Sequence, residues 1–455
     1  MIVMKFGGTS VESQEAVARV TRIVQSYEHC RPIVVVSAMG DTTNKLLKAA
    51  GEAEAGRREQ ALTLVDEVRT HHLTHGLALA GAAAAELDRY IRAHFEWLDD
   101  LIKGLSIVGE LSPRSMDAIA SVGERLSSLI VTFAFRAAGM PTHYVDARRV
   151  IVTDDRFTRA QPLLEQTYAL LQENVRPFAD TSVVVMGGFI GSTQNGQTTT
   201  LGRGGSDYTA SIVGAGVDAE EIQIWTDVDG MLTADPRIVR DGHRVKSISF
   251  AEAAEMAYFG AKVLHPATVL PAVERNIPVL ILNSRRPEAP GTRITSQPLP
   301  CKNAVKSISC KRDITAVNIQ STRMLMAHGF LRRIFEIFDR YATSVDMVST
   351  SEVSVSLTID NRDKLQPICE ELRHFAEVTT EDGQAIVCLI GENIRHTPGI
   401  AGRVFQVLSK KNVRMISQGA SELNLGLVIS EDDLKDAVRG LHDEFFCELD
   451  PAVFD

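Results

Sequence analysis

The chain opens with MIVMKFGGTSVES (residues 1–13), in which an apolar stretch leads directly into two glycines and two hydroxyl residues. Residues 2–6 have the composition of a short buried strand, and a helix-like pattern follows the glycines. A strand that turns through glycines into a helix directs backbone N–H groups at open space, which suits an anion. A tight turn that binds nothing would use the same residues, because Gly-Gly is common in turns. Taken alone, the stretch slightly favours the plain turn.

Three apolar runs extend this pattern along the first half of the chain. They are IVVVSAMG (33–40), SVVVMGGFIG (182–191) and IQIWTDVDG (222–230), and each ends in glycine. Continuous apolar strands are typical of a parallel sheet that is covered on both faces, and helical patterns, including most of residues 45–138, separate them. We therefore predict an α/β sandwich whose ligand lies at the carboxyl ends of the strands.

The overall composition limits the classes of function. The 455 residues carry a net charge of −10, which argues against a nucleic-acid-binding surface and requires any anion site to gather positive charge locally. We find no apolar run that approaches the roughly 20 residues of a membrane span, and expect no membrane partner. The six cysteines are scattered without a CxxC motif, which predicts a reducing, cytoplasmic location.

The pattern changes near RRPEAPGTRI (285–294), where prolines and glycine lie among charges and indicate a domain boundary. Beyond it, residues 328–360 and 398–430 repeat one order of features: a glycine, an amphipathic helix and two strands. In the first copy we place Phe330, Ile334, Phe335 and Phe338 on one helix face. The repeat predicts two βαββαβ regulatory modules; a duplicated packing unit without a ligand is the alternative.

Charged residues beside glycines mark the candidate chemistry. In TTTLGRGGSDYTA (198–210), Arg203, Ser206 and Asp207 lie among glycines before a helix of small residues. Arginine pairs carboxylates through two parallel hydrogen bonds, and Lys5 could neutralise the charge of a transferring phosphoryl group. Glu124, in the apolar segment SVGERLSS (121–128), needs a cationic partner. A substrate ammonium and an internal salt bridge fit it about equally well.

Other polar stretches are less specific. WTDVDGMLTADPR (225–237) places acids after a strand, where they could hold magnesium or ribose hydroxyls, or form only a turn. Lys262, in FGAKVLHPAT (259–268), could reach phosphate or lie on the surface. The sequence contains no GxxxxGK[ST] motif and no HRD or DFG set, so it is neither a P-loop enzyme nor a protein kinase. We interpret His71, His72 and His75 as a solvated helix face and predict no protein-built metal site.

Taken in order, several of these stretches resemble the motifs of the amino-acid kinase family and, within it, of the aspartokinases. The motifs are KFGGTS, VVSAMGDTTN, SVGERLS, GFIG, TTTLGRGGSDYTA, WTDVDG with TADPR, and FGAKVLHP, and they span residues 1–285. The resemblance implies a three-layer α/β kinase domain over residues 1–290, followed by two ferredoxin-like ACT domains. The first ACT domain, 313–380, would be inserted into the second, which is formed by 301–312 and 381–455.

The resemblance also implies an activity. Relatives of this type use ATP with Mg²⁺ to phosphorylate the β-carboxylate of L-aspartate, giving 4-phospho-L-aspartate at the start of lysine, threonine and methionine biosynthesis. It implies feedback inhibition by lysine through the ACT domains and a homodimer, with a tetramer as the alternative. Two other functions stay open from the residues: a kinase for glutamate or a nucleoside monophosphate, and a catalytically silent amino-acid sensor that keeps the fold as a scaffold.

Roles for individual residues follow from the same resemblance. The catalytic pair would be Lys5 and Asp207, and aspartate would contact Thr43, Glu124, Arg203 and Ser206. The nucleotide would contact Lys5, Gly7, Gly8, Thr226, Asp227, Leu232, Arg237, Lys262 and Val263. Lysine would be sensed by Met324, Phe330, Leu331, Val345, Asp346, Thr350, Ser351 and Glu352. Leu232 and Ala327 stand where relatives of this type place a tyrosine and a serine, so the nucleotide and effector contacts there should differ.

Overall fold

The computed structural model describes residues 1–260, 264, 266–321 and 328–455. The chain packs as two compact units, one of Met1–Gly230 with Leu264–Pro298, and one of Met231–Val263 with Leu299–Asp455. These units are defined by packing and do not test the domain boundaries expected at 290, 313 and 381, which stay predictions.

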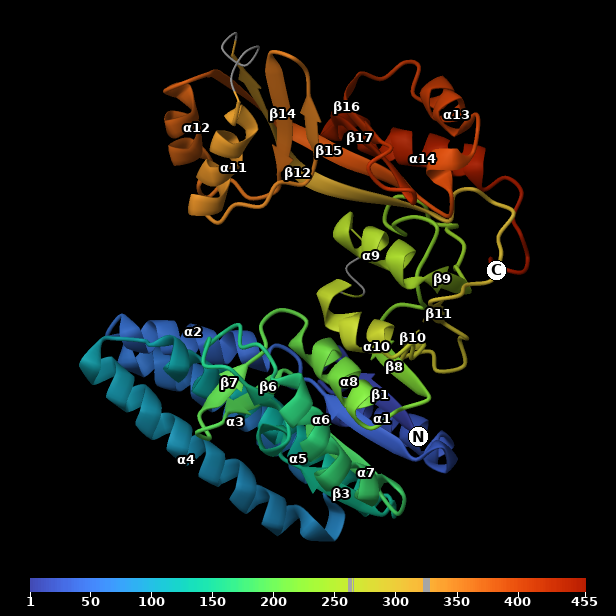
Figure 1. Ribbon diagram of the computed structural model, residues 1–455. Coiled ribbons are helices and arrows are strands. Elements are labelled where there is room, and N and C mark those ends of the chain that lie inside the picture. Colours follow the sequence, from blue (N-terminus) through green and yellow to red (C-terminus); the bar gives the residue numbers. More distant parts are fainter. Residues whose placement is uncertain (261–263, 265, 322–327) are drawn as a thin grey trace. The chain divides into compact units, whose positions relative to one another are not determined.

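The first unit is built on a twisted sheet that is mostly parallel (Figure 1). Its strands run in the order β3 (Thr142–Val145), β5 (Val183–Gly187), β2 (Pro32–Val36), β1 (Ile2–Phe6), β8 (Glu221–Thr226), β10 (Val279–Asn283) and β11 (Thr292–Thr295). The opening strand β1 lies in the middle and pairs in parallel with β2 and β8. All residues of β1, β2 and β5 are buried, as expected of strands covered on both faces.

Helices cover both faces of this sheet, which confirms the predicted sandwich. One face carries α1 (Gln14–Ser26) and α5 (Pro113–Ala137), around which α2 (Thr42–Glu54), α3 (Arg58–Leu77) and α4 (Ala84–Val108) pack. The other face carries α8 (Gly205–Gly216), with α6 (Leu164–Asn174) and α10 (Leu270–Glu274) against it. The remaining elements of this unit are α7 (Arg176–Ala179) and the small sheet of β4 (Val152–Thr153), β6 (Ile190–Thr193) and β7 (Thr198–Thr200).

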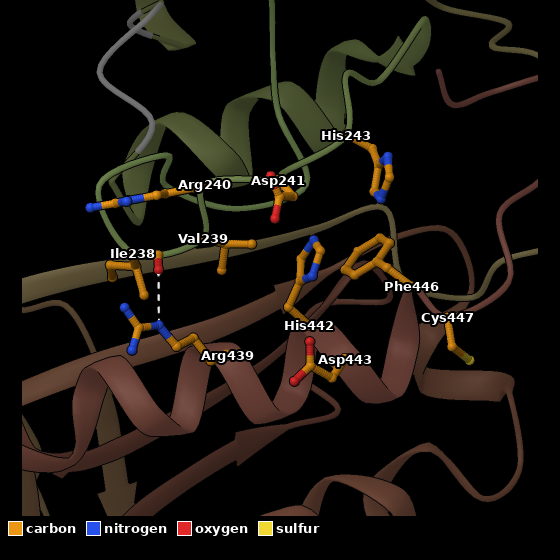
Figure 2. A pocket seen from close by; sticks show the side chains of 10 residues that line it. All are labelled: Ile238, Val239, Arg240, Asp241, His243, Arg439, His442, Asp443, Phe446 and Cys447. Atoms are coloured by element: carbon orange, nitrogen blue, oxygen red, sulfur yellow. Dashed lines mark hydrogen bonds between the residues drawn. The ribbon is translucent and has the colours of Figure 1, made fainter.

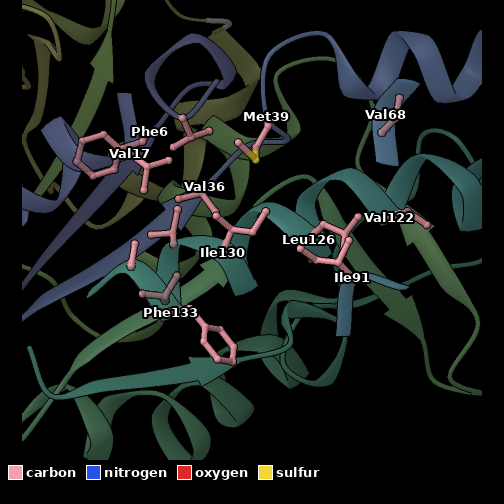
Figure 3. Close-up of a cluster of buried hydrophobic side chains, with 14 of the residues drawn as sticks. Phe6, Val17, Val36, Met39, Val68, Ile91, Val122, Leu126, Ile130 and Phe133 are labelled. Carbon is pink, nitrogen blue, oxygen red and sulfur yellow. The ribbon is translucent and has the colours of Figure 1, made fainter. Parts of the chain in front are cut away.

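The main hydrophobic core lies between β1, β2 and the α1–α5 helices (Figure 3). Phe6 and Val36 of the sheet belong to this core together with Val122, Leu126 and Ile130 of α5, and all five side chains are fully buried. Burying side chains of this size contributes about 1.5–3 kcal/mol each. This core fixes the end of β1, and with it Lys5, relative to α5.

Helix α5 corrects one expectation from the sequence. By length and composition it is apolar enough to cross a membrane, so the statement that no run approaches a membrane span was wrong. In the structure 83% of its most apolar stretch is buried inside the protein. A core helix of a globular protein meets the same criteria, and the packing of α5 against the sheet explains its composition.

The second unit contains a sheet in the order β13 (Val348–Thr350), β14 (Ser354–Ile359), β12 (Ser307–Gln320), β15 (Glu377–Ile390), β17 (Asn424–Ser430) and β16 (Val413–Gln418). Its helices are α9 (Phe250–Tyr258), α11 (Phe330–Arg340), α12 (Leu365–Arg373), α13 (Ile400–Val407) and α14 (Leu434–Phe445), and β9 (Ser247–Ser249) precedes α9.

The long strands β12 and β15 are shared by the two repeated halves. The first part of β12, Ser307–Lys311, pairs with Ile386–Ile390, whereas its last part pairs with Val378 and its neighbours and with β14. The early segment of β12 therefore lies beside the C-terminal half, next to a register shift after Lys311. In α11, Phe330, Ile334 and Phe338 are buried as predicted, but Phe335 is 40% exposed, so its assignment to that face was wrong.

The three histidines of α3 also differ from the expectation. His72 is fully buried, its Nδ1 lies 2.7 Å from the carbonyl oxygen of Val68, and its ring meets that of Phe95 edge-on. Burial lowers the pKa of His72 to about 4, so the imidazole is neutral at physiological pH. The interpretation as a solvated helix face was therefore wrong for His72, because helical spacing turns this residue toward α4.

Candidate active site

A cavity of about 500 Å³ opens at the carboxyl ends of the strands of the first unit. Five separate parts of the chain form its wall: the end of β1, the segment from the loop after β2 into α2, the middle of α5, the turn after β5 and the loop that leads into α8. The lining residues are Lys5, Gly8, Ser37, Ala38, Gly40, Thr43, Glu124, Phe189, Gly202, Arg203, Gly204, Gly205, Ser206 and Asp207. The structure thus brings together every residue for which a catalytic or aspartate-binding role was predicted.

Lys5 and Asp207 form an ion pair at this cavity, with 2.7 Å between Nζ and Oδ1. Their side chains are 11% and 15% exposed, so the pair is largely withdrawn from water. The contact is a charge pair rather than a well-directed hydrogen bond, because Oδ1 has no partner of suitable angle among the described residues. Asp207 therefore holds the ammonium in place while the N–H groups of Lys5 can still face an anion.

Glu124 is a buried carboxylate without a cationic partner in the described part of the chain. One oxygen, Oε1, accepts from the Ala38 backbone N–H at 3.2 Å, and Oε2 has no hydrogen-bond partner. Burial raises the pKa of Glu124 to about 8 despite the hydrogen bond from Ala38. Of the two partners considered for this residue, the internal salt bridge is not present, and the open oxygen suits an incoming ammonium group.

Glycines let these parts of the chain approach one another. A Cβ on Gly8 would lie 3.0 Å from the carbonyl oxygen of Ala38, and a Cβ on Gly123 would lie 2.8 Å from the Ala38 Cβ. A Cβ on Gly188 would lie 2.7 Å from the Cβ of Ser206. The glycines at 8, 123 and 188 are thus required by close packing around the cavity.

The loop that carries Arg203 is positioned by a residue that the sequence analysis missed. Asp117, on α5, accepts hydrogen bonds from the backbone N–H of Thr158 at 2.9 Å and from that of Thr200 at 3.0 Å, and from the Thr200 hydroxyl at 2.6 Å. Its burial raises its pKa, and these three donors oppose that shift. The available signal was an acid in an apolar helix, the same signal that identified Glu124.

The predicted nucleotide contacts are divided between the two units. Gly7, Thr226 and Asp227 lie in the first unit at the ends of β1 and β8, where the Gly7 N–H donates to the carbonyl of Trp225 at 3.2 Å. That N–H is therefore not free for a phosphate. Leu232 and Arg237 belong to the second unit, and the Arg237 side chain, 84% exposed, pairs with Asp235 at 2.7 Å. Lys262 and Val263 lie outside the described residues.

The predicted effector contacts surround the start of α11 and the β13 edge. Phe330 is buried in the core of its module, and Leu331 is 40% exposed. Val345 is half-buried, and the side chain of Asp346 is only 2% exposed. Thr350, Ser351 and Glu352 are exposed, and Met324 and Ala327 lie outside the described residues.

A second cavity, of about 510 Å³, lies in the second unit between residues 238–243 and α14 (Figure 2). Arg439 donates from Nε to the carbonyl oxygen of Ile238 at 3.1 Å across it. His442 contacts Thr233 at 2.9 Å, and burial together with the neighbouring His243 lowers its pKa. No residue predicted from the sequence to bind substrate or effector lines this cavity.

Comparisons with known proteins agree with this geometry. The model of the amino acid kinase family matches residues 1–283, and a model of the ACT domain matches residues 387–445. Aspartokinase 1, chloroplastic, of Arabidopsis thaliana is 40% identical over 98% of this chain and 80% of its own length. Lysine-sensitive aspartokinase 3 of Escherichia coli (strain K12) is 38% identical over 98% and 99% of the two chains.

The chain belongs to the aspartokinases of the amino acid kinase family. Solved structures support this membership at the level of the fold. Aspartokinase III of E. coli in complex with aspartate and ADP (R-state) matches with a TM-score of 0.85 and 37% identity, over 98% of this chain and all of that one. The same enzyme with lysine and aspartate (T-state) matches with a TM-score of 0.84 and 38% identity, over 98% and 99% of the two chains.

Proposed function

We infer that the chain transfers the γ-phosphoryl group of ATP to the β-carboxylate of L-aspartate, producing 4-phospho-L-aspartate. Membership of the aspartokinases supports the reaction, and the E. coli relative binds aspartate and ADP. The observation that carries the assignment to this site is the convergence of Lys5, Asp207, Glu124, Arg203 and Ser206 on one cavity.

The reaction needs charge neutralisation more than proton transfer. The β-carboxylate of aspartate has a reference pKa near 4, so it is already ionised at neutral pH and no general base is required. The enzyme must instead bring two anions, carboxylate and γ-phosphate, together against their repulsion. We assign Lys5, held by Asp207, to the charge that develops on the phosphoryl group, and the rate enhancement to positioning and electrostatics.

Selection of an amino acid rests on two groups of opposite charge. Arg203 is assigned to the α-carboxylate of aspartate, which a guanidinium can bind through two hydrogen bonds. Glu124 is assigned to the α-ammonium, because its buried Oε2 has no partner among the described residues. Binding of that ammonium would favour the ionised carboxylate and so lower the raised pKa of Glu124. Thr43 and Ser206 complete the predicted contacts.

Magnesium fits this site as a companion of the nucleotide. Among the described residues no group of three or more acids, histidines or cysteines is arranged to hold a metal. Mg²⁺ at kinase sites is held largely by the phosphates with one or two carboxylates. Of the two acids of the cavity, Glu124 is assigned to the ammonium, and Asp207, which also pairs with Lys5, is the one that would face the ion. When bound, the ion supplies positive charge at the phosphates.

Lysine is proposed as the feedback inhibitor, bound by the predicted residues of the first ACT module. An effector shifts activity only through its different affinity for active and inactive states. The E. coli relative is named lysine-sensitive and is known in a complex with lysine. We propose a homodimer through the ACT modules, with the edge strands β13 and β16, where Val348 and Ile416 are exposed, among the contact surfaces.

We also propose a cytoplasmic location, because all six cysteines are free in the described structure. The domain division at 290, 313 and 381 is retained as part of the same proposal, supported by the pairing of Ser307–Lys311 with Ile386–Ile390.

An assay of ATP-dependent aspartyl hydroxamate formation tests the proposed reaction and the role of Lys5. We expect Lys5→Ala to lower turnover by roughly 10²–10³-fold or more, because the site then loses its central positive charge. Lys45→Ala is the matched control: that lysine makes an exposed ion pair with Glu67 on the same unit, and its removal should leave turnover unchanged.

Three results would contradict the proposal. Wild-type-like hydroxamate formation by a folded Lys5→Ala variant would remove the assigned role of Lys5. Turnover of glutamate or a nucleoside monophosphate in place of aspartate would favour the alternative kinases, and no turnover with any of these would favour the silent sensor.

A further inference from the structure

Asp346 stands at a buried junction of the second unit. Its Oδ1 lies 2.7 Å from Nζ of Lys311 on β12 and accepts a hydrogen bond from the hydroxyl of Tyr258 on α9 at 3.1 Å. The other oxygen, Oδ2, is buried and has no hydrogen-bond partner among the described residues. Tyr258 is 44% exposed, and the Lys311 ammonium lies 5.2 Å from the centre of its ring.

The charges of this junction are unbalanced. Lys311 is shared, because its ammonium also lies 2.7 Å from Oδ2 of Asp360. Two carboxylates, Asp346 and Asp360, thus face one ammonium, and the side chain of Asp346 is only 2% exposed. The buried Asp346 thus shares its one ammonium with Asp360, which is 41% exposed, and its open Oδ2 favours the arrival of one more cation of ammonium type.

An entering ammonium can pair with the open Oδ2 of Asp346, and its charge then weakens the contacts that Oδ1 makes with Lys311 and Tyr258. Lys311 keeps Asp360 when it leaves Asp346, so its charge stays paired. Tyr258 is 44% exposed, so its hydroxyl can pass from the carboxylate to water. Of the two partners, Tyr258 is therefore the one whose release costs least free energy. Its release removes the contact between the last residue of α9 and Asp346.

The rest of α9 is fastened independently of Asp346. Glu252 makes a fully buried ion pair with Lys306 at 3.0 Å, and Glu255 accepts from Ser421 at 3.0 Å and from Asn424 at 2.7 Å. Loss of the Tyr258 contact would therefore act on the end of the helix and leave its first two turns in place. Lys262, a predicted nucleotide contact, follows Tyr258 by only four residues in the sequence, so a change at the end of α9 acts close to it in the chain.

We propose that Tyr258 is a positioning residue that couples occupancy of Asp346 by the effector's ammonium group to helix α9. This inference rests on the proposed regulation by lysine. Lysine binding and lysine inhibition are then separate properties. Binding needs Asp346, whereas inhibition also needs the Tyr258 hydroxyl, which leaves Asp346 when lysine binds there.

Tyr258→Phe in the full-length protein tests the coupling, since it removes only the hydroxyl. We expect lysine to bind the variant with a dissociation constant within about threefold of wild type by calorimetry. Saturating lysine should inhibit it at least threefold less, with each protein compared to its own uninhibited rate. Tyr341→Phe is the matched control, because that hydroxyl donates to Glu371 at 2.7 Å in the same unit, away from α9. It should be inhibited as wild type is.

The outcomes distinguish three cases. A merely structural role for Tyr258 would move binding and inhibition together, and would overturn the coupling. Unchanged binding and unchanged inhibition in Tyr258→Phe would also overturn it. If wild type itself fails to bind lysine while it phosphorylates aspartate, the effector assignment fails and the coupling with it, whereas the proposed reaction stands.

Discussion

At the scale of single residues, the buried carboxyl of Glu124, which has no cationic partner among the described residues, lowers the stability of the fold. Its pKa rises from 4.5 in the unfolded chain to about 8 in the folded one, because burial disfavours the ionised form. Between these values the folded state holds a proton that the unfolded state has released. Folding stability therefore falls as the pH rises through this window and levels off above about pH 8.

Glu124→Gln should remove this dependence on pH. In the absence of substrate, the variant and wild type should have similar melting temperatures near pH 4.5. The variant should then gain relative stability at about 1.4 kcal/mol per pH unit up to pH 8. Thermal melts at a series of pH values measure the difference, and parallel profiles would show that Glu124 is not held neutral in the free protein. The variant should also raise the KM for aspartate by tenfold or more.

At the scale of elements, the close contact between α5 and the loop after β2 depends on Gly123, which has no side chain. Gly123 faces Ala38, whose backbone N–H is the hydrogen-bond partner of Glu124. A methyl group at 123 would lie 2.8 Å from the Ala38 Cβ and 3.1 Å from Cγ2 of Thr42. The helix must therefore shift, and the site shifts with it.

Gly123→Ala is expected to destabilise the protein by about 1–3 kcal/mol through overpacking and to raise the KM for aspartate. Gly104→Ala is the matched control, because Gly104 is also inside a helix but has nothing within 4 Å of the added methyl. That change should stabilise by about 0.5–1 kcal/mol and leave kinetics unchanged. Urea unfolding and steady-state kinetics check both, and equal effects of the two changes would refute the packing argument.

At the scale of the whole molecule, segments far apart in the chain are joined by buried charge. Lys306 and Glu252 are 0% and 1% exposed, so helix α9 is tied to the residue before β12 by an ion pair that is withdrawn from solvent. Removing Lys306 leaves the buried carboxylate of Glu252 without its cation, which costs about 3–5 kcal/mol.

Lys306→Met should therefore destabilise the second unit strongly, and addition of Glu252→Gln should restore much of the loss by removing the orphaned charge. Arg332→Met, which breaks an exposed pair with Glu336, should change stability by no more than about 0.5 kcal/mol. Amide hydrogen exchange by mass spectrometry locates the effect: faster exchange is expected in α9 and β12. Exchange in β1 is the internal reference, and a loss of protection there would contradict the localisation.

Local sequence patterns were sufficient to predict elements and motifs in this protein. Fully apolar runs predicted β2 and β5 because a strand covered on both faces has no polar side to show. Arg203 and Asp207 were found because such residues beside glycines are rarely needed for structure alone, whereas the role of Lys5 came from the resemblance to aspartokinases. The same reasoning failed for His72 and Phe335, whose burial depends on a neighbouring element that periodicity does not reveal.

The sequence by itself determined that strand ends, glycines and charged side chains recur in the order seen in aspartokinases, and that two similar modules follow them. Only the tertiary structure decided that Lys5 meets Asp207, that Glu124 keeps an open oxygen and that Tyr258 reaches Asp346. These are contacts between residues far apart in the chain. Their distances and burial follow from the packing of whole elements, which no local pattern contains.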